Sequence, residues 1–171
     1  RINGPDLMLR LCERAAGEEW PIYLYGGREE ILSELNVRLP AAFPGLKIAG
    51  IESPPFRRLT EAEEVDACAR MKATGARLIF VGLGCPKQEQ WIARNYHRVP
   101  GVMVGVGAAF DYHAGAVKRA PQWMQNAGLE WLARLIAEPK RLFKRYLVTN
   151  TIFLSRYGPE LIWSKPKRMR L

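Results

Sequence analysis

Residues 81–124 read VGLGCPKQEQWIARNYHRVPGVMVGVGAAFDYHAGAVKRAPQWM. Two apolar runs of strand length, Leu78–Val81 and residues 102–106, border this segment or lie within it. Each run meets a pair of glycines, Gly82 and Gly84 for the first and Gly105 and Gly107 for the second. In an open parallel sheet, ligands bind beyond the carboxyl ends of the strands, and glycine lets a ligand approach the backbone closely. The segment therefore predicts two neighbouring loops that form one ligand site.

Helices and strands are predicted to alternate along the first two thirds of the chain. The predicted strands are residues 22–25, 46–51, 78–81 and 102–106, and the predicted helices are residues 5–17, 28–43, 60–74 and 87–97. The first strand ends at Gly26 and Gly27, and the third helix opens with the capping-box pattern Thr60-x-x-Glu63. This alternation is typical of an α/β domain with a mainly parallel sheet flanked by helices. Beyond Val117 only helices are predicted, over residues 120–125, 129–137 and 139–157.

Composition indicates a globular protein. The chain has 171 residues, of which 48% are hydrophobic and 25% charged, and this is enough for one domain with a core. No apolar run is long enough to cross a bilayer, and no signal peptide is visible. The three cysteines, Cys12, Cys68 and Cys85, lie far apart, which argues against a zinc site or a disulfide framework and favours the cytoplasm.

The positive charge is concentrated at the end of the chain. The net charge is +9, and residues 134–171 contribute +8 of it through ten Lys/Arg and two Glu. Such a basic segment is typical of contact with nucleic acid, anionic lipid or a phosphate-bearing ligand. A basic module that binds nucleic acid or a nucleotide, without transferase activity, is therefore one alternative, although the basic residues lie outside the glycine loops.

The glycine pairs do not fit the phosphate-binding motifs of common nucleotide folds. A G-x-G-x-x-G fingerprint would need glycine at Lys87 for the first pair, and glycine or alanine at Phe110 for the second. No P-loop motif G-x-x-x-x-G-K-[ST] is present either. A nicotinamide-dependent oxidoreductase is thus disfavoured, and no cofactor is expected.

Two polar residues open the helix that follows the first glycine pair. Lys87 and Gln88 come directly after Pro86, in the predicted first turn, where free backbone N–H groups attract an anion. The amide of Gln88 can also orient a sugar or phosphate oxygen. The alternative is that both side chains are simply solvated.

Three charged residues follow the second glycine pair. Asp111 can pair with a ribose hydroxyl or a uracil N–H, act as a base, or cap a turn. Lys118 and Arg119 can hold a diphosphate, or lie exposed at the start of a helix. His97 and His113 have no partners at metal-ligand spacing and no D-x-D sequence occurs, so no metal site is predicted.

Three segments resemble the WecG/TagA/CpsF family of bacterial glycosyltransferases. They are RINGPDLM, VGLGCPKQEQWI and GVGAAFDYHAGAVKRAPQWMQNAGLEWLARLIAEPKRLFKRYL, and the resemblance runs from Arg1 to about residue 154. It implies a Rossmann-like fold and transfer of a sugar, often N-acetylmannosamine or its uronic acid, from a UDP-sugar to an undecaprenyl-diphosphate-linked sugar. It further implies inversion at the transferred carbon and a role in cell-surface polysaccharide or teichoic acid synthesis.

The resemblance also assigns residues. Gln88 matches the active-site glutamine of the family, and Arg1 matches an active-site arginine. The family's catalytic aspartate lies upstream of the motif that RINGPDLM resembles, so we expect this chain alone to be inactive. The substrate-binding residues are predicted at the glycine loops and after them: Gly26, Gly27, Gly82, Gly84, Lys87, Gly105, Gly107, Phe110, Asp111, Lys118 and Arg119.

A two-part organisation follows from these expectations. Residues 1–130 are expected to bind the nucleotide sugar, and residues 131–171 to form a helical appendage for the lipid diphosphate and the membrane. The appendage residues named for this contact are Arg134, Arg141, Lys144 and Arg145. The expected partners are a UDP-sugar, a polyprenyl-diphosphate-linked acceptor and an anionic surface, without nucleic acid, and the expected location is the inner face of the cell membrane. Assembly into a homo-oligomer is left open.

Overall fold

The computed structural model describes residues 3–127 and 129–137, together with positions 139, 143, 147, 151 and 155. Contacts divide the chain into two compact units, and the division falls between Lys118 and Arg119. Each unit is described by itself below. The assignment of residues 1–130 to the nucleotide sugar and of residues 131–171 to the lipid diphosphate and the membrane stays a prediction.

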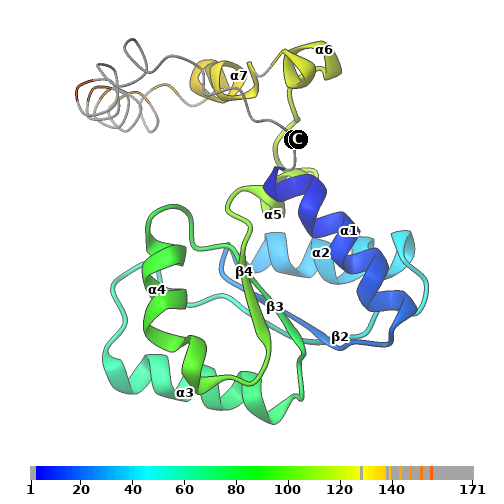
Figure 1. Ribbon diagram of the computed structural model, residues 1–171, viewed down its shortest axis with the longest axis vertical. Helices are drawn as coiled ribbons and strands as arrows, with labels where there is room; N and C mark the ends of the chain where they lie inside the picture. The colour runs from blue at the N-terminus through cyan, green and yellow to red at the C-terminus, as the bar shows by residue number, and fades with distance from the viewer. Residues whose placement is uncertain are drawn as a thin grey trace, which may run out of the picture. The chain divides into compact units, whose positions relative to one another are not determined.

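Unit 1 is built on a four-stranded sheet in which all neighbouring strands run parallel (Figure 1). The strands are β1 (Ile22–Tyr25), β2 (Ile48–Glu52), β3 (Leu78–Val81) and β4 (Val102–Gly105), in the spatial order β2-β1-β3-β4. Tyr25 pairs with Glu52 on one side and with Val81 on the other, and Val81 pairs with Gly105. The four carboxyl ends therefore lie at the same edge, and the expected α/β class with a Rossmann-like parallel sheet is confirmed.

Helices cover both faces of this sheet (Figure 1). One face packs against α1 (Gly4–Gly17), α2 (Glu29–Ala42) and α5 (Ala109–His113), and the other against α3 (Glu61–Ala73) and α4 (Lys87–Asn95). The 3-10 turn η1 (Tyr96–Arg98) follows α4. Because both faces are covered, the central strands β1 and β3 are buried at every position, which explains their unbroken apolar sequences.

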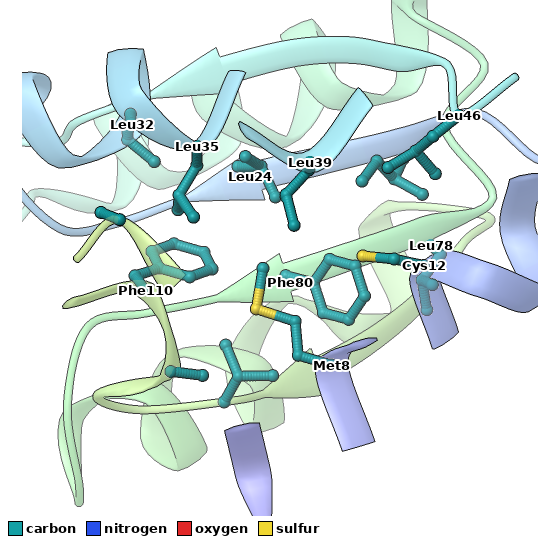
Figure 2. Packing of buried hydrophobic residues seen from close by; sticks show 14 of the residues in the cluster. Met8, Cys12, Leu24, Leu32, Leu35, Leu39, Leu46, Leu78, Phe80 and Phe110 are labelled. Atoms are coloured by element: carbon teal, nitrogen blue, oxygen red, sulfur yellow. The ribbon is translucent and has the colours of Figure 1, made fainter. Parts of the chain in front are cut away.

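The larger core lies between the sheet and the helices α1, α2 and α5. Figure 2 shows Phe80 of β3 among side chains from three helices, with Met8 from α1, Leu39 from α2 and Phe110 from α5. These side chains are at most 2% exposed, so each removes nearly all of its apolar surface from water. This packing fixes α5, and with it the loop that follows β4, against the sheet.

Side-chain caps define where two helices begin. The side chain of Asn3 accepts a hydrogen bond from the N–H of Asp6 (3.0 Å) at the start of α1. The capping box at the start of α3 is present as predicted, because Thr60 and Glu63 each bond the other's backbone N–H.

Three local features differ from the sequence prediction. Strand β2 begins at Ile48 rather than at Leu46, and Leu46 is buried in the core just before the strand. The helix predicted over residues 87–97 ends at Asn95 and continues as the 3-10 turn. Helix α5 was not predicted, because five residues are too few to show a helical period.

Unit 2 contains the helices α6 (Gln122–Asn126) and α7 (Glu130–Ala137), close to the two helices predicted over residues 120–125 and 129–137. Most of the helix predicted over residues 139–157 lies outside the described residues, as do Arg1, Arg141, Lys144, Arg145 and the side chain of Arg134. Within the described part of the chain, no helix combines the length and the apolarity needed to cross a membrane.

Candidate functional site at the carboxyl edge of the sheet

The loops that leave β1, β3 and β4 begin side by side. Backbone hydrogen bonds continue past the strand ends, from the N–H of Gly82 to the carbonyl oxygen of Tyr25 (2.8 Å) and from that of Val106 to Val81 (3.0 Å). In the sheet, β2 lies on one side of β1, and β3, the next strand in the chain, lies on the other side. The order in which strands are added therefore reverses between β1 and β3. Open α/β sheets bind ligands at such a switch point.

Glycines line this edge, and at two of them neighbouring atoms lie too close for any side chain to fit. A Cβ atom on Gly26 would lie 2.7 Å from the carbonyl carbon of Gly82, and Gly26 has φ +106°. A Cβ atom on Gly82 would lie 2.5 Å from the ring of Phe110. We call the glycines at the ends of these three strands and in the loops after them the glycine edge, and they are Gly26, Gly27, Gly82, Gly84, Gly105 and Gly107.

The ring of Phe110 belongs to the core. Its side chain is 1% exposed and packs against Gly82 from the α1, α2 and α5 side of the sheet. Phe110 was named as a substrate-binding residue, and the structure places it as support for the glycine edge.

Gln88 connects α4 to the loop after β4. Its side chain is 5% exposed, and its Oε1 accepts a hydrogen bond from the N–H of Gly107 (3.0 Å). Its Nε2 donates to Oε1 of Glu89 (2.9 Å). A Cβ atom on Gly105 would lie 2.8 Å from Nε2 of Gln88, so the glycine there makes room for the amide. The structure thus brings the helix that follows the first glycine pair into contact with the second pair.

The position of α4 is fixed by a charged network with α3. Arg94 donates two hydrogen bonds to the carboxylate of Glu64 (2.6 and 3.2 Å), and Nδ2 of Asn95 donates to Oε2 of the same group (2.9 Å). Hydrogen bonds from Arg94 hold the pKa of Glu64 below its usual value, against the opposing effect of burial. Because Gln88, Trp91 and Asn95 are the buried residues of α4, this network sets the place of Gln88.

Asp111 carries a half-buried carboxylate on α5. Its backbone oxygen accepts hydrogen bonds from the N–H groups of Ala116 (3.0 Å) and Val117 (3.2 Å), which closes the turn after the helix. Among the described residues, the carboxylate itself makes no hydrogen bond or ion pair. It is therefore available to a ligand.

Of the three cations predicted at this edge, Lys87 and Lys118 are exposed and Arg119 is half-buried. Lys87 is the first residue of α4 and is exposed, and Gly84 before it has open space where a Cβ atom would lie. Lys118 and Arg119 lie on either side of the division between the units. Their role in binding a diphosphate stays a prediction.

Two contacts at the site were not foreseen. The hydroxyl of Ser53 donates to the carbonyl oxygen of Gly27 (2.7 Å), which ties the loop after β2 to the loop after β1. Glu89 was not singled out, although an acidic residue in a first helical turn is favoured by the helix dipole. The position of Glu89 in a first helical turn was visible in the sequence, but the sequence did not indicate that its carboxylate would accept a hydrogen bond from the side-chain amide of Gln88.

Further polar features lie at the end of β2, where the carbonyl oxygen of Glu52 accepts a hydrogen bond from the N–H of Gly26 (2.9 Å). A cavity of about 150 Å³ lies at the end of β2 and is lined in part by Glu52 and Arg70. The Glu52 carboxylate is already bonded to Arg70 and to the hydroxyl of Tyr23 (3.1 Å). Burial, with the charge of Glu52, raises the pKa of Tyr23 to about 12. The part of the chain that the structure describes holds no group of His, Cys, Asp and Glu side chains that could bind a metal ion.

The carboxyl edge of the sheet thus combines glycines at a switch point, the buried amide of Gln88 and the half-buried carboxylate of Asp111. The family model described as "Glycosyl transferase WecG/TagA/CpsF family" matches residues 1–168. The match covers nearly all of the 171 residues and includes all three segments quoted above. The chain belongs to the WecG/TagA/CpsF family of glycosyltransferases.

Proposed function

We propose that the glycine edge binds a UDP-sugar whose sugar, N-acetylmannosamine or its uronic acid, is transferred with inversion to a polyprenyl-diphosphate-linked sugar. Such a step belongs to the synthesis of bacterial cell-surface polysaccharide or teichoic acid. Family membership supports the transferase class. The donor, the acceptor and the stereochemistry are our proposal.

The observation that carries the proposal is the joint position of Gln88 and the glycine edge. Gly84, in the loop between β3 and α4, has open space where a Cβ atom would lie, so a diphosphate can approach the backbone there. The amide of Gln88 lies against Gly105 and Gly107, where it can meet a sugar or phosphate oxygen. Lys87, exposed at the start of α4, adds a positive charge that favours an anionic donor.

Asp111 suits the nucleoside part of the donor. A carboxylate accepts hydrogen bonds, and both the ribose hydroxyls and the N–H of uracil can donate them. The group is half-buried, and no described residue competes for its oxygens. We therefore assign Asp111 to nucleoside binding rather than to proton transfer.

Unit 2 is proposed to bind the membrane and the acceptor. Among its described residues, five large hydrophobic side chains are exposed: Trp123, Trp131, Ile136, Phe143 and Leu147. Exposed aromatic and aliphatic side chains beside many cations are typical of segments that lie on an anionic membrane surface. We propose that Arg134, Arg141, Lys144 and Arg145 meet the lipid diphosphate and anionic head groups, on the inner face of the cell membrane.

Titration calorimetry with UDP tests the site assignment. Gln88→Ala and Asp111→Ala are each expected to weaken UDP binding about tenfold, the effect of losing one hydrogen bond to a charged or strongly polar group. Gln90→Ala on the same helix and Asp66→Ala on α3 are matched controls, because both side chains are exposed. They should leave the affinity unchanged.

Two outcomes would contradict this proposal in different ways. Equal affinity of the wild type and of both site variants would show that UDP binds elsewhere. Tighter binding of NAD than of UDP by the wild-type chain would show that the donor class is wrong.

A further inference from the structure

The amide of Gln88 has a single orientation that satisfies both of its neighbours. A backbone N–H can only donate, so Gly107 must face Oε1, and the distance is 3.0 Å. A carboxylate can only accept, so Glu89 must face Nε2, at 2.9 Å. Rotating the amide by half a turn would place two donors together at Gly107 and two acceptors together at Glu89.

The two contacts leave part of the amide unused. A glutamine amide has two N–H donors, and its oxygen has two lone pairs. Gly107 uses one lone pair and Glu89 uses one N–H. One donor and one acceptor position remain, beside the Gly105 backbone that makes room for Nε2.

We propose that Glu89 is a positioning residue, which orients the Gln88 amide toward the sugar nucleotide. The remaining N–H of the amide would then donate to a hydroxyl or phosphate oxygen, and its remaining lone pair would accept from a hydroxyl. This inference rests on the proposed function of the glycine edge. Glu89 touches no ligand in this account and acts through Gln88. It is exposed and lies in the first turn of α4, so its replacement does not disturb the core.

A simpler role for Glu89 makes the opposite prediction. A carboxylate that only adds negative charge near a diphosphate would repel it, so removing the charge would strengthen UDP binding. A carboxylate that orients Gln88 would weaken UDP binding when removed. The sign of the change therefore separates the two roles.

The test measures UDP affinity by calorimetry in a set of variants. Glu89→Ala should weaken binding about tenfold, through loss of one charge-assisted hydrogen bond that holds the amide. Glu89→Gln should stay within about threefold of wild type, because its own amide oxygen can still accept from Nε2 of Gln88. Glu29→Ala, which removes an exposed carboxylate from the first turn of α2, is the matched control and should have no effect.

A double variant shows whether Glu89 acts through Gln88. Once Gln88→Ala has removed the amide, adding Glu89→Ala should weaken UDP binding no further. Additive effects in the double variant would overturn the proposal, and so would unchanged or tighter binding by Glu89→Ala.

Hydrogen exchange of the Gly107 N–H gives a readout that needs no ligand. A correctly oriented Gln88 protects this N–H, so Glu89→Ala should speed its exchange while Glu89→Gln restores protection. If wild-type protein bound no UDP but showed this exchange pattern, the proposed function would fail and the positioning role would stand. Unchanged Gly107 exchange in Glu89→Ala would refute the positioning role whether or not UDP binds.

Discussion

Replacing Gly26 by alanine is expected to lower the free energy of unfolding by about 3 kcal/mol, from the combined cost of a left-handed backbone and overpacking. Gly26 has φ +106°, and the new Cβ atom would lie 2.7 Å from the carbonyl carbon of Gly82. Backbone cannot rotate away as a side chain can, so the ends of β1 and β3 would have to separate. Urea unfolding followed by circular dichroism measures the change.

Two other glycines separate the causes of this effect. Gly75 has φ +67° with nothing within 4 Å of a Cβ atom, so Gly75→Ala should cost about 1 kcal/mol from the backbone alone. Gly17, at the end of α1, also has open space and has no positive φ, so Gly17→Ala should be neutral or slightly stabilising. Equal losses at Gly26 and Gly75 would mean that the approach of the two loops is not close.

Deleting residues 138–171 is expected to abolish the salt-sensitive sedimentation of this protein with anionic liposomes. The deleted segment holds nine of the 26 Lys/Arg and two of the 17 Asp/Glu, so the net charge falls from +9 to +2. Near an anionic surface each basic residue contributes about 1 kcal/mol, and salt screens this attraction. The full chain should therefore sediment with the liposomes at low salt and be released at high salt, while UDP binding by the truncated protein stays intact.

A charge-matched pair of variants tests whether position matters. Neutralising Lys140, Arg141, Lys144 and Arg145 with glutamine removes four charges from the appendage. The control removes four exposed cations of unit 1: Arg10, Arg28, Arg58 and Lys72. Loss of sedimentation in the first variant alone supports a membrane contact in the appendage. Equal loss in both variants would mean that only the total charge matters.

Much of the fold could be predicted from the sequence, because its two central strands are buried on both faces. Such strands appear as short continuous apolar runs that end at glycine, and β1 and β3 have the predicted bounds. The capping box of α3 could likewise be predicted, because its two members, Thr60 and Glu63, are three residues apart. These features depend on near neighbours in the chain.

Several of the features that the sequence did not indicate depend on residues far apart in the chain. Gln88 and Gly107 are 19 residues apart, and Glu64 and Arg94 are 30 apart. No local pattern indicates which N–H an amide will bond, or that Phe110 will fill the space against Gly82. The sequence could therefore indicate which residues gather at the carboxyl edge, but not which of them support the others.

Nuclear magnetic resonance of glycine-labelled protein during a UDP titration tests the central claim most directly. Glycines occur at both edges of the sheet, so they report where the ligand binds. The glycine edge consists of Gly26, Gly27, Gly82, Gly84, Gly105 and Gly107, and the opposite edge has Gly45, Gly75 and Gly101 just before β2, β3 and β4. Binding at the carboxyl edge predicts that UDP shifts the amide signals of the first set and leaves those of the second set unchanged. Shifts confined to the second set, or no shift in either set at saturating UDP, would contradict it.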